Sequence, residues 1–106
     1  MKTIPIGGRK NVFPATVILL EADINYTRLY LENGEKMIVA TTLKKLEARF
    51  ADEGSFFRSS KSYLINLDFM TTYDLENSEI LMQNHKTVLI SRRRKPKFLT
   101  QMNLNF

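Results

Sequence analysis

The sequence predicts a mainly β fold with short α-helices. Most of its apolar runs are about four residues long, which is the length of a strand, and they are rich in β-branched side chains. The pair Asn33-Gly34 lies between two such runs and is a strong hairpin signal. Only residues 43–50 and the stretch after Pro96 show a pattern suited to a helix.

The N-terminal residues predict three strands. Ile4 and Ile6 alternate with polar or proline positions before the Gly7-Gly8 pair, and the apolar residues 12–13 follow that pair, so a turn between two short strands is expected. The apolar run 17–20 stops at Glu21 and is too short for a buried helix. It therefore predicts the third strand.

The next segment predicts a hairpin followed by a helix. Residues 26–31 and 36–39 flank the Asn33-Gly34 pair, and both of its residues tolerate the positive φ of a type I′ turn. After Thr42, an expected N-cap, apolar side chains recur at positions 43, 46 and 50 with charged residues between them. This spacing predicts an amphipathic helix of about two turns that covers the sheet.

The C-terminal half predicts a second hairpin and a terminal helix. Phe56 and Phe57 lead into the polar segment 58–62, which the apolar-rich segment 63–67 follows, and residues 79–82 and 87–90 flank a turn. A proline inside a helix removes a hydrogen bond, so the last helix is expected to begin at Pro96 and residues 92–95 to form a loop. Its buried face is expected to comprise Phe98, Leu99 and Met102.

Size and composition are those of one globular domain, expected over residues 1–106. Apolar residues make up 43% and charged residues 25%, and there is no cysteine for disulfides or zinc-thiolate sites. The start lacks the apolar core of a signal peptide, and no stretch approaches the roughly eighteen apolar residues of a membrane span. A cytoplasmic location without membrane insertion is expected.

The positive charge lies at one end of the chain. Residues 1–79 carry ten basic and eleven acidic side chains, a net charge of −1, whereas residues 80–106 carry six basic and no acidic ones. This asymmetry favours a polyanionic partner such as nucleic acid or an anionic membrane surface. A solvated basic tail that binds nothing is the alternative.

The sequence gives little support for catalysis, a metal or a cofactor. His85 is the one histidine, falls in a predicted turn and has no nucleophile elbow or metal-ligand spacing around it. Glu21 and Asp23 would share one face of a continued strand, but no further group would separate their roles as acid and base. Neither glycine-rich nucleotide-binding motif is present. No enzyme activity, metal or cofactor is therefore expected.

Three polar segments rich in hydrogen-bond donors interrupt or end apolar strands: residues 25–28, 58–62 and 91–95. Arginine and lysine neutralise phosphates and pair with guanine edges, while Asn, Ser, Thr and Tyr donate to phosphates or bases. The shared composition favours nucleic-acid binding, although each segment alone could be an ordinary solvated loop.

The same segments resemble, in order, three signatures of the LytTR family of DNA-binding domains. Residues 18–27 (ILLEADINYT) resemble the first, in which an Asn-Tyr-Thr step follows a glutamate. Residues 56–66 (FFRSSKSYLIN) resemble the second, F-x-R-x-H-x-S before apolar residues and an asparagine, with Ser60 in place of the usual histidine. Residues 90–93 (ISRR) resemble the third, so that the likeness extends over nearly the whole chain.

This resemblance implies an elongated antiparallel β-sheet or sandwich whose loops enter successive major grooves of double-stranded DNA. It also implies a bacterial-type transcription regulator, similar to response regulators, in which two protomers occupy paired direct repeats. The chain has no room for the receiver domain that many relatives carry, and control by a separate regulatory protein is one open possibility.

By position, the resemblance implies that Lys61 and Arg93 read base edges and that the loop at residues 25–26 is a third reading element. Phosphate contacts are implied for Arg58, Ser62, Arg92, Arg94 and Lys95. The candidate DNA-binding residues are Asn25, Tyr26, Thr27, Arg28, Arg58, Ser60, Lys61, Ser62, Ser91, Arg92, Arg93, Arg94 and Lys95.

Structural roles stay open for several of these residues. Asn25 could cap a turn, Tyr26 could pack in the core and Arg58 could form an internal ion pair, while Ser62 and Asn66 could satisfy buried backbone groups, which is the expected role of Asn66. Two other functions also stay open: a basic adaptor for a protein or membrane surface without sequence-specific DNA binding, and a small hydrolase built around His85.

Overall fold

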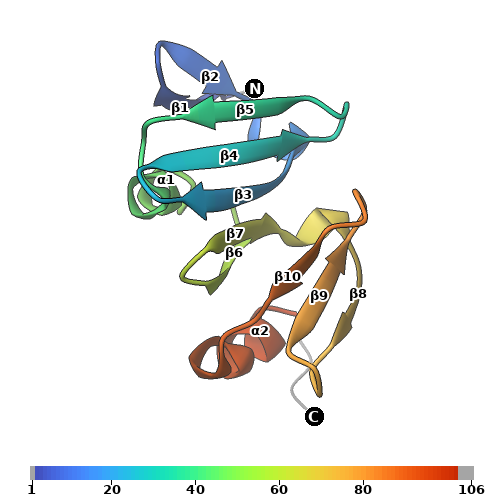
Figure 1. The fold of residues 1–106 in the computed structure, drawn as a ribbon. Coiled ribbons are helices and arrows are strands. Elements are labelled where there is room, and N and C mark those ends of the chain that lie inside the picture. Colours follow the sequence, from blue (N-terminus) through green and yellow to red (C-terminus); the bar gives the residue numbers. More distant parts are fainter. Residues whose placement is uncertain (1, 103–106) are drawn as a thin grey trace.

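The computed structural model describes residues 2–102, and within them the fold is mainly β, with two short α-helices (Figure 1). The predicted fold class is confirmed. In chain order the strands are β1 (Ile4–Gly7), β2 (Lys10–Val12), β3 (Val17–Asp23), β4 (Tyr26–Leu31), β5 (Lys36–Val39), β6 (Phe56–Ser60), β7 (Tyr63–Asn66), β8 (Met70–Asp74), β9 (Glu79–Met82) and β10 (Thr87–Leu89). The α-helices are α1 (Leu43–Arg49) and α2 (Lys95–Gln101), and the 3-10 helices are η1 (Pro14–Thr16), η2 (Leu67–Phe69) and η3 (Arg92–Arg94).

Three antiparallel sheets build the molecule, which measures 43 × 30 × 24 Å and is elongated as expected. The central sheet has five strands in the order β5-β4-β3-β7-β6. Strands β1 and β2 form a separate hairpin, and β10-β9-β8 form a three-stranded sheet. In Figure 1 that smaller sheet and α2 lie on the side of the central sheet opposite the β1-β2 hairpin.

Both faces of the central sheet are covered, which explains why the run 17–20 shows no alternation of apolar and polar residues. Val17 and Leu20 of β3 pack in a core with α1 and the β1-β2 hairpin. Ile18 and Leu19 pack in a second core that contains Phe98 of α2 and the three-stranded sheet. A register shift between Val17 and Leu19 accompanies this distribution, so one strand belongs to both cores.

The predicted hairpins are confirmed, but the type predicted for the turn between β4 and β5 is wrong. Gly34 has a φ of 89° and Asn33 does not have a positive φ, so a type I′ turn, which needs both, is excluded. The Gly34 N–H donates to the Leu31 carbonyl at 3.0 Å, and the Leu31 N–H donates to the Glu35 carbonyl at 2.9 Å. These bonds fit a three-residue loop that ends on a left-handed glycine.

Helix α1 forms where it was predicted and covers the central sheet. The Thr42 side chain accepts a hydrogen bond from the Lys45 N–H at 3.3 Å and caps the helix. Leu43, Leu46 and Phe50 are buried in the core that they share with β3. The spacing of these three side chains therefore predicted the buried face correctly.

Several boundaries after residue 56 differ from the prediction. Residues 58–60 continue β6 rather than starting a loop, so only residues 61–62 form the turn to β7. Strand β8 was not predicted because most of its side chains are polar or exposed. Residues 92–94 form η3 rather than a loop, and α2 begins at Lys95, one residue before Pro96.

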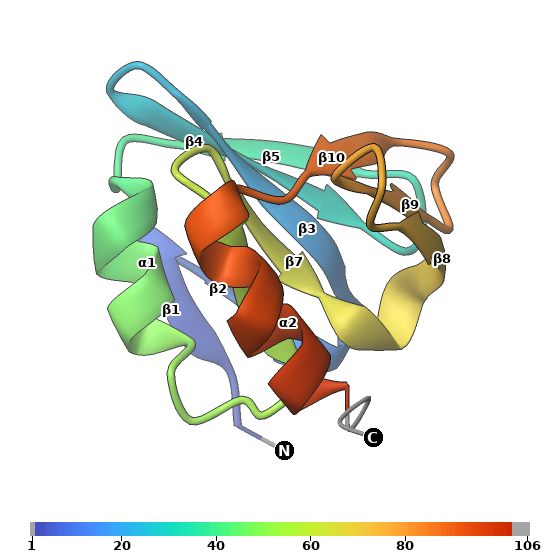
Figure 2. The same ribbon diagram turned by 90° about the horizontal axis from the view of Figure 1, so that it is seen from below.

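The terminal helix packs as expected. Phe98 is fully buried, and the partly buried Leu99 and Met102 pack against the same core. In Figure 2, α2 lies in front of the central sheet. Across residues 2–102, neither α-helix has the length and apolar character needed to span a membrane.

Candidate nucleic-acid interface

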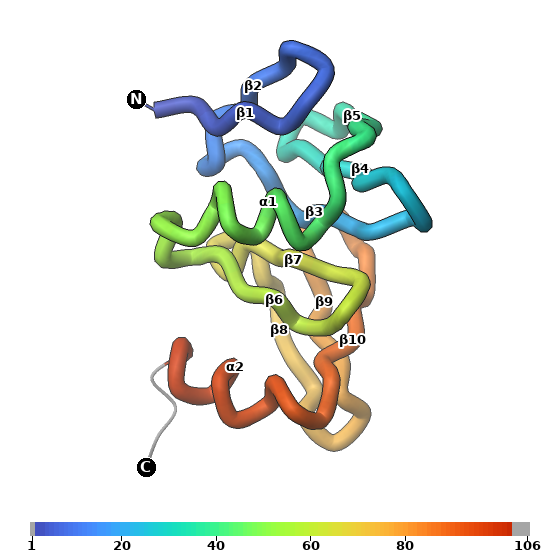
Figure 3. Tube along the Cα trace, turned by 90° about the vertical axis from the view of Figure 1, so that its left-hand side faces the viewer, coloured from blue at the N-terminus to red at the C-terminus, as the bar shows by residue number. Residues whose placement is uncertain are grey.

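Two turns between strands and the connection from the last strand to α2 lie on one side of the molecule, the left-hand side in Figure 1. They are the β3-β4 turn (residues 24–25), the β6-β7 turn (residues 61–62) and η3, which follows β10. Figure 3 shows the same three segments one below another along one border of the molecule. We call this side the loop edge. It brings together the three donor-rich segments that the sequence placed far apart.

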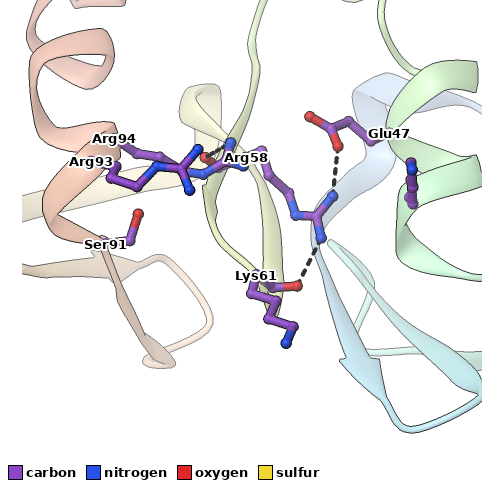
Figure 4. Close-up of a pocket in the computed structure, with 7 residues that line it drawn as sticks. Glu47, Arg58, Lys61, Ser91, Arg93 and Arg94 are labelled. Atoms are coloured by element: carbon purple, nitrogen blue, oxygen red, sulfur yellow. Dashed lines mark hydrogen bonds and ion pairs between the residues drawn. The ribbon is translucent and has the colours of Figure 1, made fainter.

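A basic hollow of about 420 Å³ lies on the loop edge between α1, β6, the β6-β7 turn and η3 (Figure 4). Lys61 and Arg93 are both exposed and both line it, although they come from separate connections. Its lining residues are Lys44, Glu47, Arg58, Lys61, Ser91, Arg93 and Arg94. Five cations and one carboxylate give this surface a strongly positive character.

Arg58 holds this hollow together from within. Its Nη1 donates to the Glu47 carboxylate at 2.6 Å, and its Nε and Nη2 donate to the Ser60 and Lys61 carbonyls at 2.8 and 2.7 Å. The side chain is only 12% exposed. The expectation of a phosphate contact is therefore corrected: Arg58 forms the internal ion pair that the sequence left open and fixes the β6-β7 turn to α1.

Further hydrogen bonds attach η3 to the same frame. The Ser91 N–H donates to the Ser59 carbonyl at 2.8 Å, and Arg94 Nη1 donates to the Arg58 carbonyl at 3.1 Å. Ser60, which stands where the family has a histidine, accepts from the Ser62 N–H at 3.2 Å through its Oγ. Ser60, Ser91 and Arg94 thus shape the backbone beneath the exposed cations.

The other candidate cations of the β6-β7 turn and of residues 91–95 are either bonded within the protein or unpaired among the described residues. Lys95 is partly buried and its Nζ donates to the Leu75 carbonyl at 2.9 Å, so it reaches toward the β8-β9 connection and not toward the hollow. The side chains of Lys61, Arg92 and Arg93 make no hydrogen bond or ion pair to any residue within 2–102 and are exposed. These three are available to a ligand.

The β3-β4 turn contributes fewer residues than predicted. Asn25 is exposed and Tyr26 is 53% exposed, so the core position that was open for Tyr26 is excluded. Thr27 is fully buried and donates from Oγ1 to the Thr41 carbonyl at 2.7 Å, so it is corrected to a structural residue. Arg28 forms ion pairs with Asp23 and Glu21, so its guanidinium group already has partners within the protein.

Glu21 anchors the β3-β4 hairpin close to its turn. Its carboxylate accepts from the Tyr30 and Tyr63 hydroxyls at 2.9 and 3.1 Å and lies 3.5 Å from Lys86 Nζ. Burial alone raises the pKa of this carboxyl, but Tyr30, Lys86 and Tyr63 outweigh burial and hold the pKa below its ordinary value. The cluster joins β3, β4 and β7 to the β9-β10 turn.

The structure also places two other residues that the sequence singled out. His85 is exposed in the β9-β10 turn with a φ of 69°, as expected for a turn residue. Asn66 is buried, donates from Nδ2 to the Val17 carbonyl at 3.0 Å and accepts from the Asp68 N–H through Oδ1. No group of three potential metal-ligating side chains occurs in the described part of the chain.

Sequence reasoning missed Lys44 and Glu47, which line the hollow from α1. Their spacing of three residues on the exposed face of the predicted helix was the available signal, because residues three apart share a helix face. The sequence does not show that α1 packs beside β6, so it could not place this helix face next to Lys61.

The model of the LytTr DNA-binding domain family matches residues 8–103. Among solved structures, a LytTr DNA-binding domain from Bacillus cereus, part of a protein described as a methyl-accepting/DNA response regulator, has a similar fold. The two chains are 21% identical with a TM-score of 0.75, and the match covers 95% of this chain and 94% of the other. The comparison with curated proteins finds no match.

Proposed function

Because this chain belongs to the LytTR family of DNA-binding domains, we propose that it regulates transcription by binding a specific sequence of double-stranded DNA through the loop edge. The observation that carries this proposal is the position of Lys61 and Arg93, two exposed cations from separate connections that line one hollow. A surface that approaches a double helix needs such convergence to contact bases and backbone together.

The difference between unpaired and paired cations within residues 2–102 supports a division of roles. Arg93 is suited to pair with a guanine edge through two hydrogen bonds, and Lys61 to donate to an acceptor on a base. Arg92 and Lys44, both exposed, are suited to phosphates. Arg58 and Arg94 act as positioning residues because their guanidinium groups bond to protein carbonyls.

The dimensions support recognition of successive grooves. The longest extent of the molecule is 43 Å, whereas one turn of B-DNA rises roughly 34–36 Å. A domain laid along the helix axis would therefore reach two major grooves on one face. We propose that two protomers bind paired direct repeats in this way, in the cytoplasm, where bacterial DNA lies.

Selection of bound duplexes from a random pool tests the proposed function. We expect the wild-type protein to recover a pair of spaced repeats and to prefer the recovered duplex over a scrambled duplex of equal composition by at least about a thousandfold. The preference should persist as salt rises, while binding to both duplexes weakens. Equal affinity for both duplexes would instead support the basic adaptor and overturn sequence-specific recognition.

A further inference from the structure

Ile24 adopts a backbone conformation that is unfavourable for its side chain. Asp23 and Tyr26 pair across the β3-β4 hairpin, so Ile24 and Asn25 form a two-residue turn. Ile24 has a φ of 55°, whereas Asn25 does not have a positive φ, which is the sign pattern of a type II′ turn. Glycine is usual at the first position of that turn, and a β-branched residue there is a conformational outlier.

The fold gains nothing visible from this residue. The Ile24 side chain is 92% exposed, so it buries almost no apolar surface that could offset the strain. The other described non-glycine residues with positive φ are Arg9, Ser78 and His85, none of which is β-branched. Strained residues of this kind persist at functional sites, which points to a use for the exposed isoleucine.

The position of the turn indicates what the side chain meets. The β3-β4 turn projects beyond the neighbouring strands (Figure 2) and lies on the loop edge with the β6-β7 turn and η3 (Figure 3). Exposed Asn25 and Tyr26 follow Ile24 directly, so the tip combines polar donors with one aliphatic group. The thymine 5-methyl is the one aliphatic group that base edges present in the major groove.

We propose that Ile24 is a specificity-determining residue that contacts the 5-methyl group of thymine in the major groove. The inference rests on the proposed function and extends it, since Lys61 and Arg93 recognise polar base edges and Ile24 adds discrimination for thymine. A strained turn holds the aliphatic side chain outward at the tip, where a glycine would leave no group to contact the base.

Replacement of single thymines by deoxyuridine in the selected duplex tests this contact, because deoxyuridine lacks only the 5-methyl group. We expect one or two positions in each half-site at which the wild type binds about fourfold more weakly after replacement, the effect of losing one buried methyl. Ile24→Ala and Ile24→Gly should bind the two duplexes equally at those positions. Ile38→Ala, which alters an isoleucine that is 59% exposed on β5, should keep the wild-type response.

Three outcomes decide the inference. A thymine response that disappears in both Ile24 variants and persists in Ile38→Ala supports it. Wild-type preference for the selected duplex without any thymine response, or with a response that the Ile24 variants retain, overturns this inference and leaves the proposed function standing. Loss of preference between selected and scrambled duplexes in the wild type overturns both. Thermal melting of Ile24→Gly confirms that the variant is folded.

Discussion

The β6-β7 turn and the β3-β4 turn lie on the same edge, but the rest of the molecule holds them in different ways. Arg58 bonds to two carbonyls of the β6-β7 turn region and to Glu47, and η3 is attached to β6 by two more hydrogen bonds. The tip of the β3-β4 turn carries the strained and exposed Ile24, and the firm contacts of its hairpin begin at Asp23 on one strand and at Thr27 on the other.

This difference teaches how one edge can hold two kinds of contact. The braced β6-β7 turn and η3 hold the backbone at Lys61 and Arg93 in place, which suits directional hydrogen bonds from these side chains to base edges. A projecting two-residue turn presents an aliphatic group, whose contact with a methyl needs no fixed angle. Substitution of the bracing residue Arg58 should therefore affect stability and DNA binding together, and substitution of the exposed Arg93 or Ile24 should separate them.

The largest effect is expected for Arg58→Met, which keeps most of the side-chain volume and removes three hydrogen bonds. The free energy of unfolding should fall by about 2–4 kcal/mol, because Glu47 and two carbonyls lose their partner. Chemical denaturation measures this loss. Arg49→Met is the matched control, since Arg49 on α1 is exposed and donates only to the Pro5 carbonyl. Equal losses in the two variants would show that Arg58 does not brace the turn.

Arg93→Ala should separate binding from stability. Affinity for the selected duplex should fall by about 1–3 kcal/mol, with relaxed preference at particular base pairs, because a paired contact to guanine is lost. Lys97→Ala removes the same charge from an exposed position on α2 and should weaken selected and scrambled duplexes alike. Fluorescence titrations with both duplexes measure the difference. Uniform weakening by Arg93→Ala would remove Arg93 from the base-reading residues.

A smaller effect of opposite sign is expected for Ile24→Gly. The free energy of unfolding should rise by about 0.5–1 kcal/mol, because glycine accepts the positive φ at this position without strain. The same change at the next residue, Asn25→Gly, should bring no such gain, since Asn25 does not have a positive φ. Thermal melting of the two variants checks both predictions. A loss of stability in Ile24→Gly would contradict the inference that the Ile24 backbone is strained.

The smallest effect concerns Glu21, which lies close to the turn of the same hairpin. The folded-state pKa of Glu21 lies below its ordinary value of 4.5, so the charged carboxylate stabilises the fold. This contribution is fully present above pH 4.5 and is lost as the pH falls through the lowered folded-state pKa. Stability measured between pH 6 and pH 3 (about the acid range of a carboxylate) should therefore decline less steeply in Glu21→Gln than in the wild type. If stability declines equally with falling pH in both proteins, Glu21 does not cause the loss of stability in acid.

The sequence predicted the elements whose pattern is local. Asn33-Gly34 placed one hairpin, and the spacing of Leu43, Leu46 and Phe50 placed α1, because turn preference and helical period act within a few residues. Strand β8 escaped prediction because its burial depends on a neighbouring strand more than on its own residues.

The candidate site could be predicted only in part for the same reason. Donor-rich composition indicated the segments 58–62 and 91–95, the resemblance to the LytTR signatures selected Lys61 and Arg93 within them, and the structure places both on one hollow. Whether a cation is available to DNA depends on its partners in space. Arg58 pairs with Glu47, 11 residues away, and Lys95 donates to the carbonyl of Leu75, 20 residues away. Thr27 is fully buried and its hydroxyl donates to the Thr41 carbonyl, a contact that composition could not reveal.

The most direct test of the loop edge is an NMR titration of the ¹⁵N-labelled protein with the selected duplex. Amide shifts should be largest in the β3-β4 turn, the β6-β7 turn and η3, and small in the β4-β5 and β9-β10 turns, which lie on the opposite side of the molecule (Figure 1). Shifts concentrated in those opposite turns, or confined to η3 alone, would contradict recognition of DNA by the converging connections of this edge.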